Sequence, residues 1–185
     1  AREALDGRTI VVTLTEPATL TVTTVVAVYA PVDRAERRRW VCDLHRLLVG
    51  TPRLIVVGDW NFVPDVTTPY DRVGGGDANG GSAEWAAMAA ADELDLTEVL
   101  GGMTGAQRTF NDLTWRSNKK GTRGGRTMRR LDWMAVTTGL MSEVVDYTTT
   151  PPWFTKLGSA DTPGTDHSTI TAKLAAAAAA LQGGV

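Results

Sequence analysis

The sequence lacks the features that mark several large classes of protein. It has a single cysteine, so no disulfide can form within the chain, and a reducing compartment or indifference to redox is the economical interpretation. No apolar run approaches the roughly 20 residues that span a bilayer, and no signal peptide pattern opens the chain. The formal net charge of −2 argues against a globally basic coat for nucleic acid. We therefore expect an intracellular protein with no membrane association.

The cysteine and one of the two histidines are expected to carry no chemistry. Cys42 stands near Trp40 and Leu44, which predicts a small core residue rather than a nucleophile. His45 falls in the polar, basic part of an amphipathic helix pattern, which predicts a surface position. The other histidine, His167, is the one whose surroundings suggest a function.

The length of 185 residues and the hydrophobic content of 43% suit one globular domain that buries a substantial core. We assign residues 1–174 to this domain. Six alanines follow Leu174, and we interpret residues 175–185 as an Ala-rich linker or tail.

Strand and helix patterns alternate along the chain, which predicts a layered α/β domain. Val, Ile and Thr predominate at 9–14 and 20–29, and we expect the second of these strands to be buried on both faces. Asp33 and Glu36 form a capping-box-like start for a helix with apolar residues at helical spacing. Further expected elements are a strand at 54–57, a helix from Ser82 toward Leu94, strands at 107–111, 131–137 and 168–174, and an irregular connection at 148–165.

The segment Gly58-Asp59-Trp60-Asn61 directly follows a buried strand. Ligands of layered α/β proteins bind at this carboxyl edge of the sheet. Alternation along the chain can point Asp59 and Asn61 the same way, which places a carboxylate beside an amide that donates to a phosphate oxygen. The alternative is an Asx turn that only closes the strand.

A second candidate segment is Thr165-Asp166-His167-Ser168, which stands at the entrance of a β-branched strand. Asp166 is a hard oxygen ligand suited to Mg²⁺, and the imidazolium of His167 can stabilise charge on a phosphorane. The alternative is a loop aspartate beside a surface histidine.

A third candidate is Asp132, which lies among apolar residues in Arg130-Leu131-Asp132-Trp133. Burying an unpaired carboxylate is costly, so Asp132 needs a donor. His167 would form the carboxylate–histidine pair that orients an imidazole. A salt bridge to Arg129 or Arg130 is the alternative.

The candidate segments belong to a longer ordered series of motifs. In chain order these are Val28-Tyr29-Ala30-Pro31, Gly58-Asp59-Trp60-Asn61, Leu113-Thr114-Trp115, Arg130-Leu131-Asp132-Trp133 and Asp166-His167. The series resembles the signature of the endonuclease/exonuclease/phosphatase superfamily. The Arg-rich helix after the first motif, and Tyr70-Asp71-Arg72 after the second, most resemble the apurinic-type endonuclease domains of non-LTR (LINE-type) retrotransposons.

This resemblance covers residues 7–174 and implies a four-layer α/β sandwich, in which two packed β-sheets are flanked by helices. It implies a metal-dependent endonuclease that cuts a phosphodiester with Mg²⁺ or Mn²⁺ and nicks target DNA for retrotransposition. The implied partners are DNA and a reverse transcriptase domain in the parent polypeptide. A eukaryotic retroelement would act in the nucleus.

The resemblance also implies a role for each matching residue. Asp59 would orient or deprotonate the attacking water while Asn61 holds the scissile phosphate. His167 would stabilise the transition state, with Asp132 behind it as orienter. The implied metal ligands are Asp59, Asn61, Asp166 and His167.

Two aromatic residues of the motifs have implied positions. Tyr29 would lie beside the phosphate and assist charge development, whereas without the motif order it is a core-edge aromatic. Trp60 replaces the more usual Phe and is expected to face away from the site, because neighbouring residues of a strand alternate.

The chain departs from the family pattern at its start. Family members have a strand ending in Asn and then a strand-end Glu, a principal metal ligand, well before the Tyr-Ala-Pro motif. Neither Glu3 nor Glu16 follows a suitable buried strand, so we assign neither as this ligand. We expect an N-terminally truncated domain without its first strands, which binds metal weakly and is impaired in catalysis.

A cationic segment lies between 116 and 130, with seven basic and no acidic residues. In a Gly-rich context it predicts a flexible loop that tracks a phosphate backbone, with Trp115 or Trp133 near enough to stack on a base. A solvated hairpin is the alternative. The predicted nucleic-acid-binding residues are Trp115, Arg116, Lys119, Lys120, Arg123, Arg126, Arg129 and Arg130.

Two other functions stay open at this point. One is a phosphatase or phosphodiesterase of the same fold that acts on a lipid or a nucleotide. The other is a noncatalytic remnant that only binds nucleic acid. The cationic segment favours nucleic acid over a lipid, and the set of polar site residues favours an enzyme over a remnant.

Overall fold

The structure is a computed structural model, and it describes residues 1–64, 72–73, 82–90, 94–103, 113–120, 126–150 and 167–175. For residues 72–73, 116–120 and 126–128 it describes the backbone alone. In chain order the elements are β1 (Arg2–Ala4), β2 (Thr9–Thr15), β3 (Val22–Tyr29), α1 (Arg34–Leu48), β4 (Leu54–Asp59), β5 (Arg72–Val73), α2 (Ser82–Ala89), β6 (Leu96–Glu98), α3 (Val99–Gly102), β7 (Trp115–Lys120), β8 (Arg126–Arg129), β9 (Asp132–Thr137), the 3-10 helix η3 (Thr138–Glu143), β10 (Val144–Thr150) and β11 (Thr169–Leu174).

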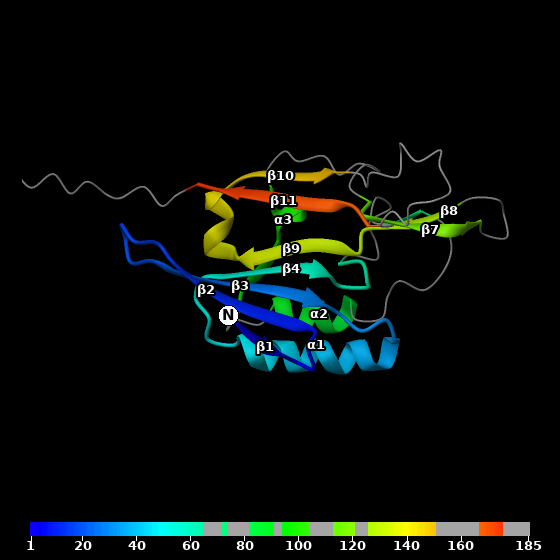
Figure 1. The fold of residues 1–185 in the computed structure, drawn as a ribbon, viewed down its shortest axis with the longest axis horizontal. Helices are drawn as coiled ribbons and strands as arrows, with labels where there is room; N and C mark the ends of the chain where they lie inside the picture. The colour runs from blue at the N-terminus through cyan, green and yellow to red at the C-terminus, as the bar shows by residue number, and fades with distance from the viewer. Residues whose placement is uncertain are drawn as a thin grey trace, which may run out of the picture.

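A six-stranded sheet forms the centre of the molecule, in the order β1-β2-β3-β4-β9-β6 (Figure 1). Strands β3 and β4 are parallel and are joined by α1, whereas β9 runs antiparallel to β4. The register places Tyr29 opposite Asp59, and Asp59 opposite Asp132. The ends of β3 and β4 and the beginning of β9 therefore meet at one edge of the sheet.

Helices α1 and α2 cover one face of this sheet, and most of the core lies beneath them. The carboxylate of Asp33 accepts the amide hydrogen of Glu36 and caps α1, as the sequence predicts. Buried residues recur along α1 at Trp40, Leu44 and Leu48, spaced to face the sheet. Cys42 lies outside this stripe and is exposed, so the prediction of a core cysteine is wrong.

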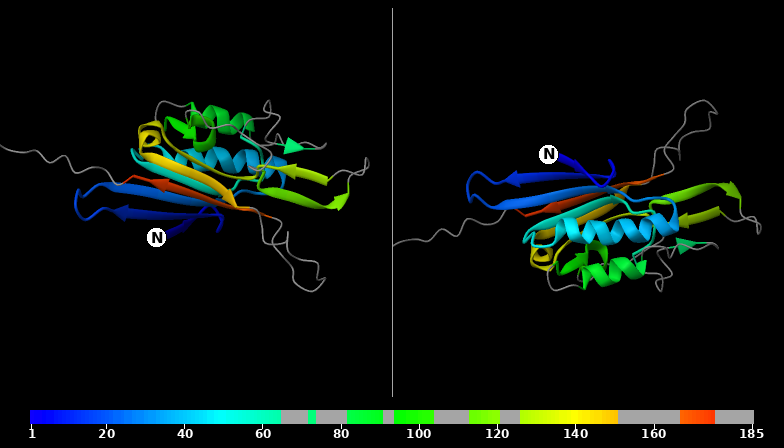
Figure 2. Two further views of the ribbon diagram at one scale, coloured as in Figure 1. Left: turned by 90° about the horizontal axis from the view of Figure 1, so that it is seen from above. Right: turned by 90° about the horizontal axis from the view of Figure 1, so that it is seen from below.

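The opposite face of the sheet carries a second, two-stranded sheet formed by β10 and β11 (Figure 2). Ile170, Ala172 and Leu174 of β11 pack toward Ile55 and Met134 of the large sheet. The two packed sheets and the helices confirm the predicted α/β sandwich. Helices α1 and α2 flank the large sheet on one side, and α3 contributes Val99 to the core between the large sheet and the β10–β11 sheet.

The small sheet covers only part of the large one, which leaves apolar side chains of β2 open to solvent. Ile10 is 49% exposed and Leu14 is 54% exposed. Ala27 of β3, which pairs with Ile10, is exposed as well. The expectation that β3 is buried on both faces is therefore wrong, since burial on this face depends on strands that pack over it.

The cationic segment predicted as a loop instead contains regular strands. Strands β7 and β8 pair as an antiparallel hairpin, and β5 adds to β8 to give a third, three-stranded sheet. Extended backbone fits the alternative hairpin interpretation. The connection at 121–125 lies outside the described residues.

Other predicted elements differ in their limits. Helix α2 ends at Ala89, short of the predicted limit near Leu94. Strand β10 extends to Thr150, into the segment expected to be irregular. His45 is half-buried rather than fully exposed. The predicted strand at 107–111 and the tail from 176 lie outside the described residues, and no described helix is long and apolar enough to cross a bilayer.

An ion pair joins the two sheets at the end far from the Asp59 edge. The guanidinium of Arg53, just before β4, donates to both carboxylate oxygens of Glu143 at 2.8 and 2.9 Å. These hydrogen bonds hold the pKa of Glu143 below its ordinary value. A carboxyl group with a lowered pKa stabilises the native state at neutral pH, and this contribution disappears as pH falls through the lowered pKa.

We predict that Glu143→Gln lowers the free energy of unfolding by about 1 kcal/mol near pH 7, because a half-buried bidentate pair is lost. The deficit should shrink below about pH 4, where the native glutamate also becomes protonated. Urea unfolding of both proteins across this range measures it. Glu36→Gln is the control. Glu36 also faces an arginine, Arg8, but its side chain is half-exposed and the 3.6 Å separation is longer than in the Arg53–Glu143 pair, so its loss should cost less. A deficit independent of pH would contradict the prediction.

Candidate active site

The edge where β3 and β4 end is shaped by a close approach of the two backbones. Gly58 has a φ of +148°, and a Cβ atom built there would lie 2.0 Å from the carbonyl oxygen of Val28. Only glycine fits at this position. Asp59, the last residue of β4, is thereby held directly beside the end of β3.

Asp59 and Asn61 are linked by a tight local turn. One carboxylate oxygen of Asp59, Oδ1, accepts the backbone N–H of Asn61 at 2.9 Å. Asn61 has a φ of +54°, and its side-chain amide donates to the carbonyl of Ala30 at 2.7 Å. The Asx turn considered as an alternative is therefore present. It also gives the two side chains fixed positions, so it does not conflict with a functional site.

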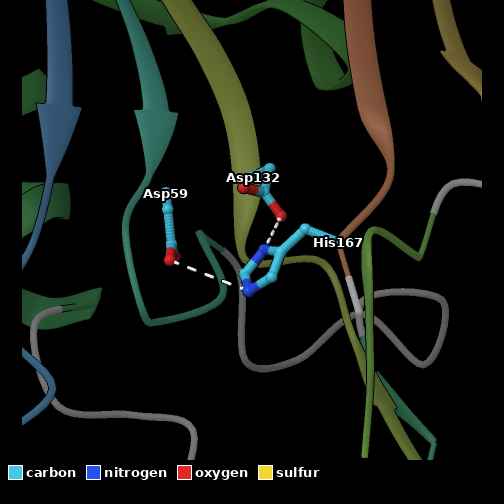
Figure 3. Close-up of side chains that lie close together, drawn as sticks. All are labelled: Asp59, Asp132 and His167. Carbon is cyan, nitrogen blue, oxygen red and sulfur yellow. Dashed lines mark hydrogen bonds and ion pairs between the residues drawn. The ribbon is translucent and has the colours of Figure 1, made fainter. Parts of the chain in front are cut away.

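His167 lies between two carboxylates (Figure 3). Its Nδ1 is 2.8 Å from Oδ2 of Asp132, and its Nε2 is 4.0 Å from Oδ2 of Asp59. Asp59 ends β4, Asp132 begins β9, and His167 lies two residues before β11, so the three side chains are brought together only by the fold. The predicted Asp132–His167 pair is present, while its catalytic role stays a prediction.

The hydrogen bond to Asp132 decides how the imidazole is protonated. An ionised carboxylate can only accept hydrogen bonds, so in this pair the hydrogen is on Nδ1 and the Nδ1–H donates a hydrogen bond to Oδ2 of Asp132. The Nε2 side then faces Asp59 (Figure 3). In the neutral form Nε2 can take a proton or bind a cation, and in the protonated form the ring adds a positive charge near Asp59.

The donor set fits a divalent cation. Asp59, Asp132 and His167 each offer one ligand atom, and these atoms lie within 4.8 Å of one another. Mg²⁺ is commonly held by one or two carboxylates together with substrate phosphate oxygens, which suits Asp59. Mn²⁺ also accepts imidazole nitrogen. Asp166, predicted as a further ligand, lies outside the described residues.

Tyr29 lies at the same edge but is not a core-edge aromatic. It is 52% exposed, and the guanidinium of Arg8 lies 5.6 Å from its ring centroid, within cation–π range. The register places Tyr29 opposite Asp59. Arg8 was not identified from the sequence, because its contact with Tyr29 depends on the pairing of β2 with β3.

The predicted nucleic-acid-binding residues fall into four groups, of which the buried Arg130 is described in the next paragraph. Trp115 is half-buried with the guanidinium of Arg129 5.9 Å from its ring centroid, and its backbone forms a β-bridge with His167. Arg123 lies outside the described residues. Five further residues have their backbones on the hairpin of β7 and β8, namely Arg116, Lys119, Lys120, Arg126 and Arg129.

For two residues, Arg130 and Trp133, the predicted contact with nucleic acid is wrong because both are buried. Arg130 is 1% exposed and donates to Glu98 at 2.7 Å, so this guanidinium stabilises the fold and cannot reach a phosphate backbone. Glu98 also accepts backbone N–H groups at the start of α3. Trp133 is fully buried and cannot stack on a base, whereas Trp60 is buried and faces away from the site as expected.

Comparison with known proteins supports the fold at low sequence identity. No protein-family model matches the sequence, and no curated protein is significantly similar to it. Among solved structures, the chain is similar to the 3′ phosphatase NExo from Neisseria bound to product DNA hairpin, with 17% identity and a TM-score of 0.57. It is also similar to the endonuclease domain of TRAS1, a telomere-specific non-LTR retrotransposon, with 16% identity and a TM-score of 0.57. An AP endonuclease from Archaeoglobus fulgidus is 18% identical, with a TM-score of 0.56.

The matches cover most of this chain but less of the other proteins. The NExo and TRAS1 matches each cover 91% of this chain, and 65% and 64% of those chains respectively. The Archaeoglobus match covers 82% of this chain and 61% of that chain. The chain thus spans slightly less than two thirds of these neighbours. At these identities the likeness shows the fold alone: the chain shares the α/β sandwich fold of these nuclease and phosphatase structures.

Proposed function

We propose that this chain is a metal-dependent phosphodiester hydrolase, and specifically the endonuclease domain of a non-LTR retrotransposon that nicks target DNA. The observation that carries the proposal is the placement of His167 between Asp132 and Asp59 at one sheet edge. A hydrolase needs a base or water-orienting group beside a group that stabilises developing negative charge. Asp59 and His167 meet both needs within 4.0 Å.

Each residue has a distinct role in this proposal. Asp59 orients or deprotonates the attacking water, and Asn61 holds the scissile phosphate through its amide. His167 stabilises the negative charge of the transition state, and Asp132 fixes the orientation of its ring. Tyr29, at the end of β3, assists charge development at the phosphate.

The proposed cofactor is Mg²⁺ or Mn²⁺. Asp59 and His167 would hold it within the described residues, together with Asn61 and, outside them, Asp166. A bound divalent cation supplies Lewis-acid polarisation of the phosphoryl oxygens and helps to offset charge in the transition state. The carboxylates of the chain keep their own roles in orienting the water and the imidazole.

DNA is favoured as the substrate by two observations. The hairpin of β7 and β8 carries basic residues, and its first residue, Trp115, forms a β-bridge with His167, so the hairpin leads directly into the site. A basic hairpin in this place can track a phosphate backbone next to the reacting bond. The fold neighbours named above include a phosphatase bound to a DNA hairpin and a retrotransposon endonuclease domain. We also propose that a reverse transcriptase domain belongs to the parent polypeptide.

We expect the activity of this chain alone to be low. Among the described residues, the group that could hold a metal ion consists of Asp59, Asp132 and His167, and no glutamate belongs to it. Asp132 accepts a hydrogen bond from His167 and Asp59 accepts one from the N–H of Asn61, so both carboxylates are shared with protein donors. We therefore expect these side chains alone to hold Mg²⁺ weakly, with substrate phosphate completing the coordination.

Nicking of supercoiled plasmid tests the proposal. With Mg²⁺ or Mn²⁺ in millimolar excess, we expect slow conversion to open circles that EDTA stops and that Asp59→Asn abolishes, because the amide cannot act as a base. DNA binding without any cleavage at high enzyme concentration and with either cation would instead indicate a noncatalytic nucleic-acid-binding protein. Cleavage of a phosphoinositide or a nucleotide in preference to plasmid would indicate the phosphatase alternative.

A second prediction separates catalysis from binding. Asp132→Ala removes the acceptor of the His167 ring, so the nicking rate should fall at least about 10-fold, the usual cost of losing an orienting partner. Affinity for DNA, measured by fluorescence anisotropy, should change much less. Asp146→Ala is the matched control, since Asp146 pairs with Lys173 on β10 and β11. An equal loss of binding and nicking would count against an orienting role.

A third prediction concerns the hairpin. The double substitution Lys119→Gln and Lys120→Gln should weaken DNA binding for all sequences and reduce the slope of log affinity against log salt by roughly 1 to 2, because each lost phosphate contact releases one counterion fewer. Arg46→Gln provides the control, because Arg46 is 78% exposed on α1. An unchanged salt slope in the double variant would remove the hairpin from the DNA interface.

A further inference from the structure

Thr114 occupies a buried position between the hairpin and the candidate site. It is 1% exposed, and its hydroxyl oxygen accepts two backbone N–H groups, from Leu131 at 3.0 Å and from Asp132 at 2.8 Å. These two amides lie at the beginning of β9, and one of them belongs to Asp132 itself. One side-chain oxygen thus fixes the backbone from which Asp132 extends.

The backbone of the same residue holds the other partner of the pair. The carbonyl of Thr114 accepts the N–H of Ser168 at 2.6 Å, and the next residue, Trp115, forms a β-bridge with His167. The N–H of Thr114 donates to the carbonyl of Arg129 at 3.0 Å. Thr114 therefore connects the segment of Asp132 to the segment of His167, which are 35 residues apart in the sequence.

We propose that Thr114 is a positioning residue that sets the distance between Asp132 and His167. The proposal rests on the proposed function for its catalytic meaning, but its geometric content stands independently. A hydrogen bond of 2.8 Å between these side chains tolerates a displacement of only a few tenths of an ångström before it weakens. Thr114 hydrogen-bonds to both segments and so limits how far they can move relative to each other.

The hydroxyl is the part of Thr114 that matters for Asp132. A valine has nearly the same shape and the same preference for extended backbone, but it leaves two buried amides without an acceptor. We expect the start of β9 to shift toward another acceptor in that variant, with the Asp132 carboxylate moving away from the imidazole. The carbonyl of residue 114, by contrast, persists in every variant, so His167 should keep its place.

The experiment measures the Asp132–His167 hydrogen bond directly, by proton–nitrogen NMR of the His167 ring in the whole chain. The parent protein should show a low-field Nδ1–H proton and the tautomer with hydrogen on Nδ1. In Thr114→Val this proton should move upfield or disappear by exchange, whereas in Thr114→Ser it should stay. Thr137→Val is the matched control: Thr137 lies at the other end of β9, and its hydroxyl oxygen also accepts a backbone N–H, from Leu54 at 3.4 Å.

Three results would overturn the proposal: a folded Thr114→Val protein with an unchanged His167 signal, a folded Thr114→Ser protein that has lost it, or an equal change in Thr137→Val. Should Thr114→Val fail to fold, hydrogen exchange in the parent protein decides the question. The amides of Leu131 and Asp132 should be protected in it, and rapid exchange of both would also overturn the proposal.

Enzyme kinetics then separate this proposal from the proposed function. If the chain nicks DNA, Thr114→Val should lower kcat by about 10-fold with KM nearly unchanged, and Thr114→Ser should restore most of it. A change in KM alone would overturn the positioning role. If no variant and no parent protein nicks DNA, the proposed function fails, while the NMR measurement still confirms or rejects the role of Thr114 in holding the pair.

Discussion

The candidate site depends on one packing interaction, the stacking of Trp60 on Trp133. Their ring centroids are 4.1 Å apart and the planes are inclined by 9°. Each indole N–H donates to a backbone carbonyl near the partner ring, from Trp60 to Trp133 and from Trp133 to Phe62. Both indoles are fully buried in the core between the sheet and the helices, so this contact helps to fix the register of β4 and β9.

This stack has a direct consequence for the carboxylates, because each tryptophan immediately follows one of them in the sequence. Neighbouring residues point to opposite sides of the chain, so burying Trp60 and Trp133 in the helix-covered core turns Asp59 and Asp132 the other way. The two carboxylates then flank His167, one at each ring nitrogen (Figure 3). Apolar burial thus provides the force that holds charged groups at the positions their chemistry requires.

The sequence predicted those features that depend on residues close together in the chain. The cap at Asp33 and the apolar stripe of α1 follow from helical spacing within a few residues. The burial of Arg130 has no such signal, because its partner Glu98 is 32 residues away in the sequence. The exposure of Ala27 likewise depends on which strands pack over it. The Asp132–His167 pair was predictable because a carboxylate among apolar residues requires a donor, and few donors were available.

The open face of the large sheet lies on the side away from the helices and does not support the site. The apolar side chains of Ile10 and Leu14 project from β2, and Leu14 pairs with Thr23 near the start of β3, far from the edge that carries Asp59. The tryptophan stack lies instead in the core beneath α1 and α2, where aromatic neighbours such as Trp85 pack edge-on against both rings. The direction of the two carboxylates therefore depends on the covered face, whereas His167 is held by the β-bridge to Trp115 and by the hydrogen bond from the N–H of Ser168 to the carbonyl of Thr114.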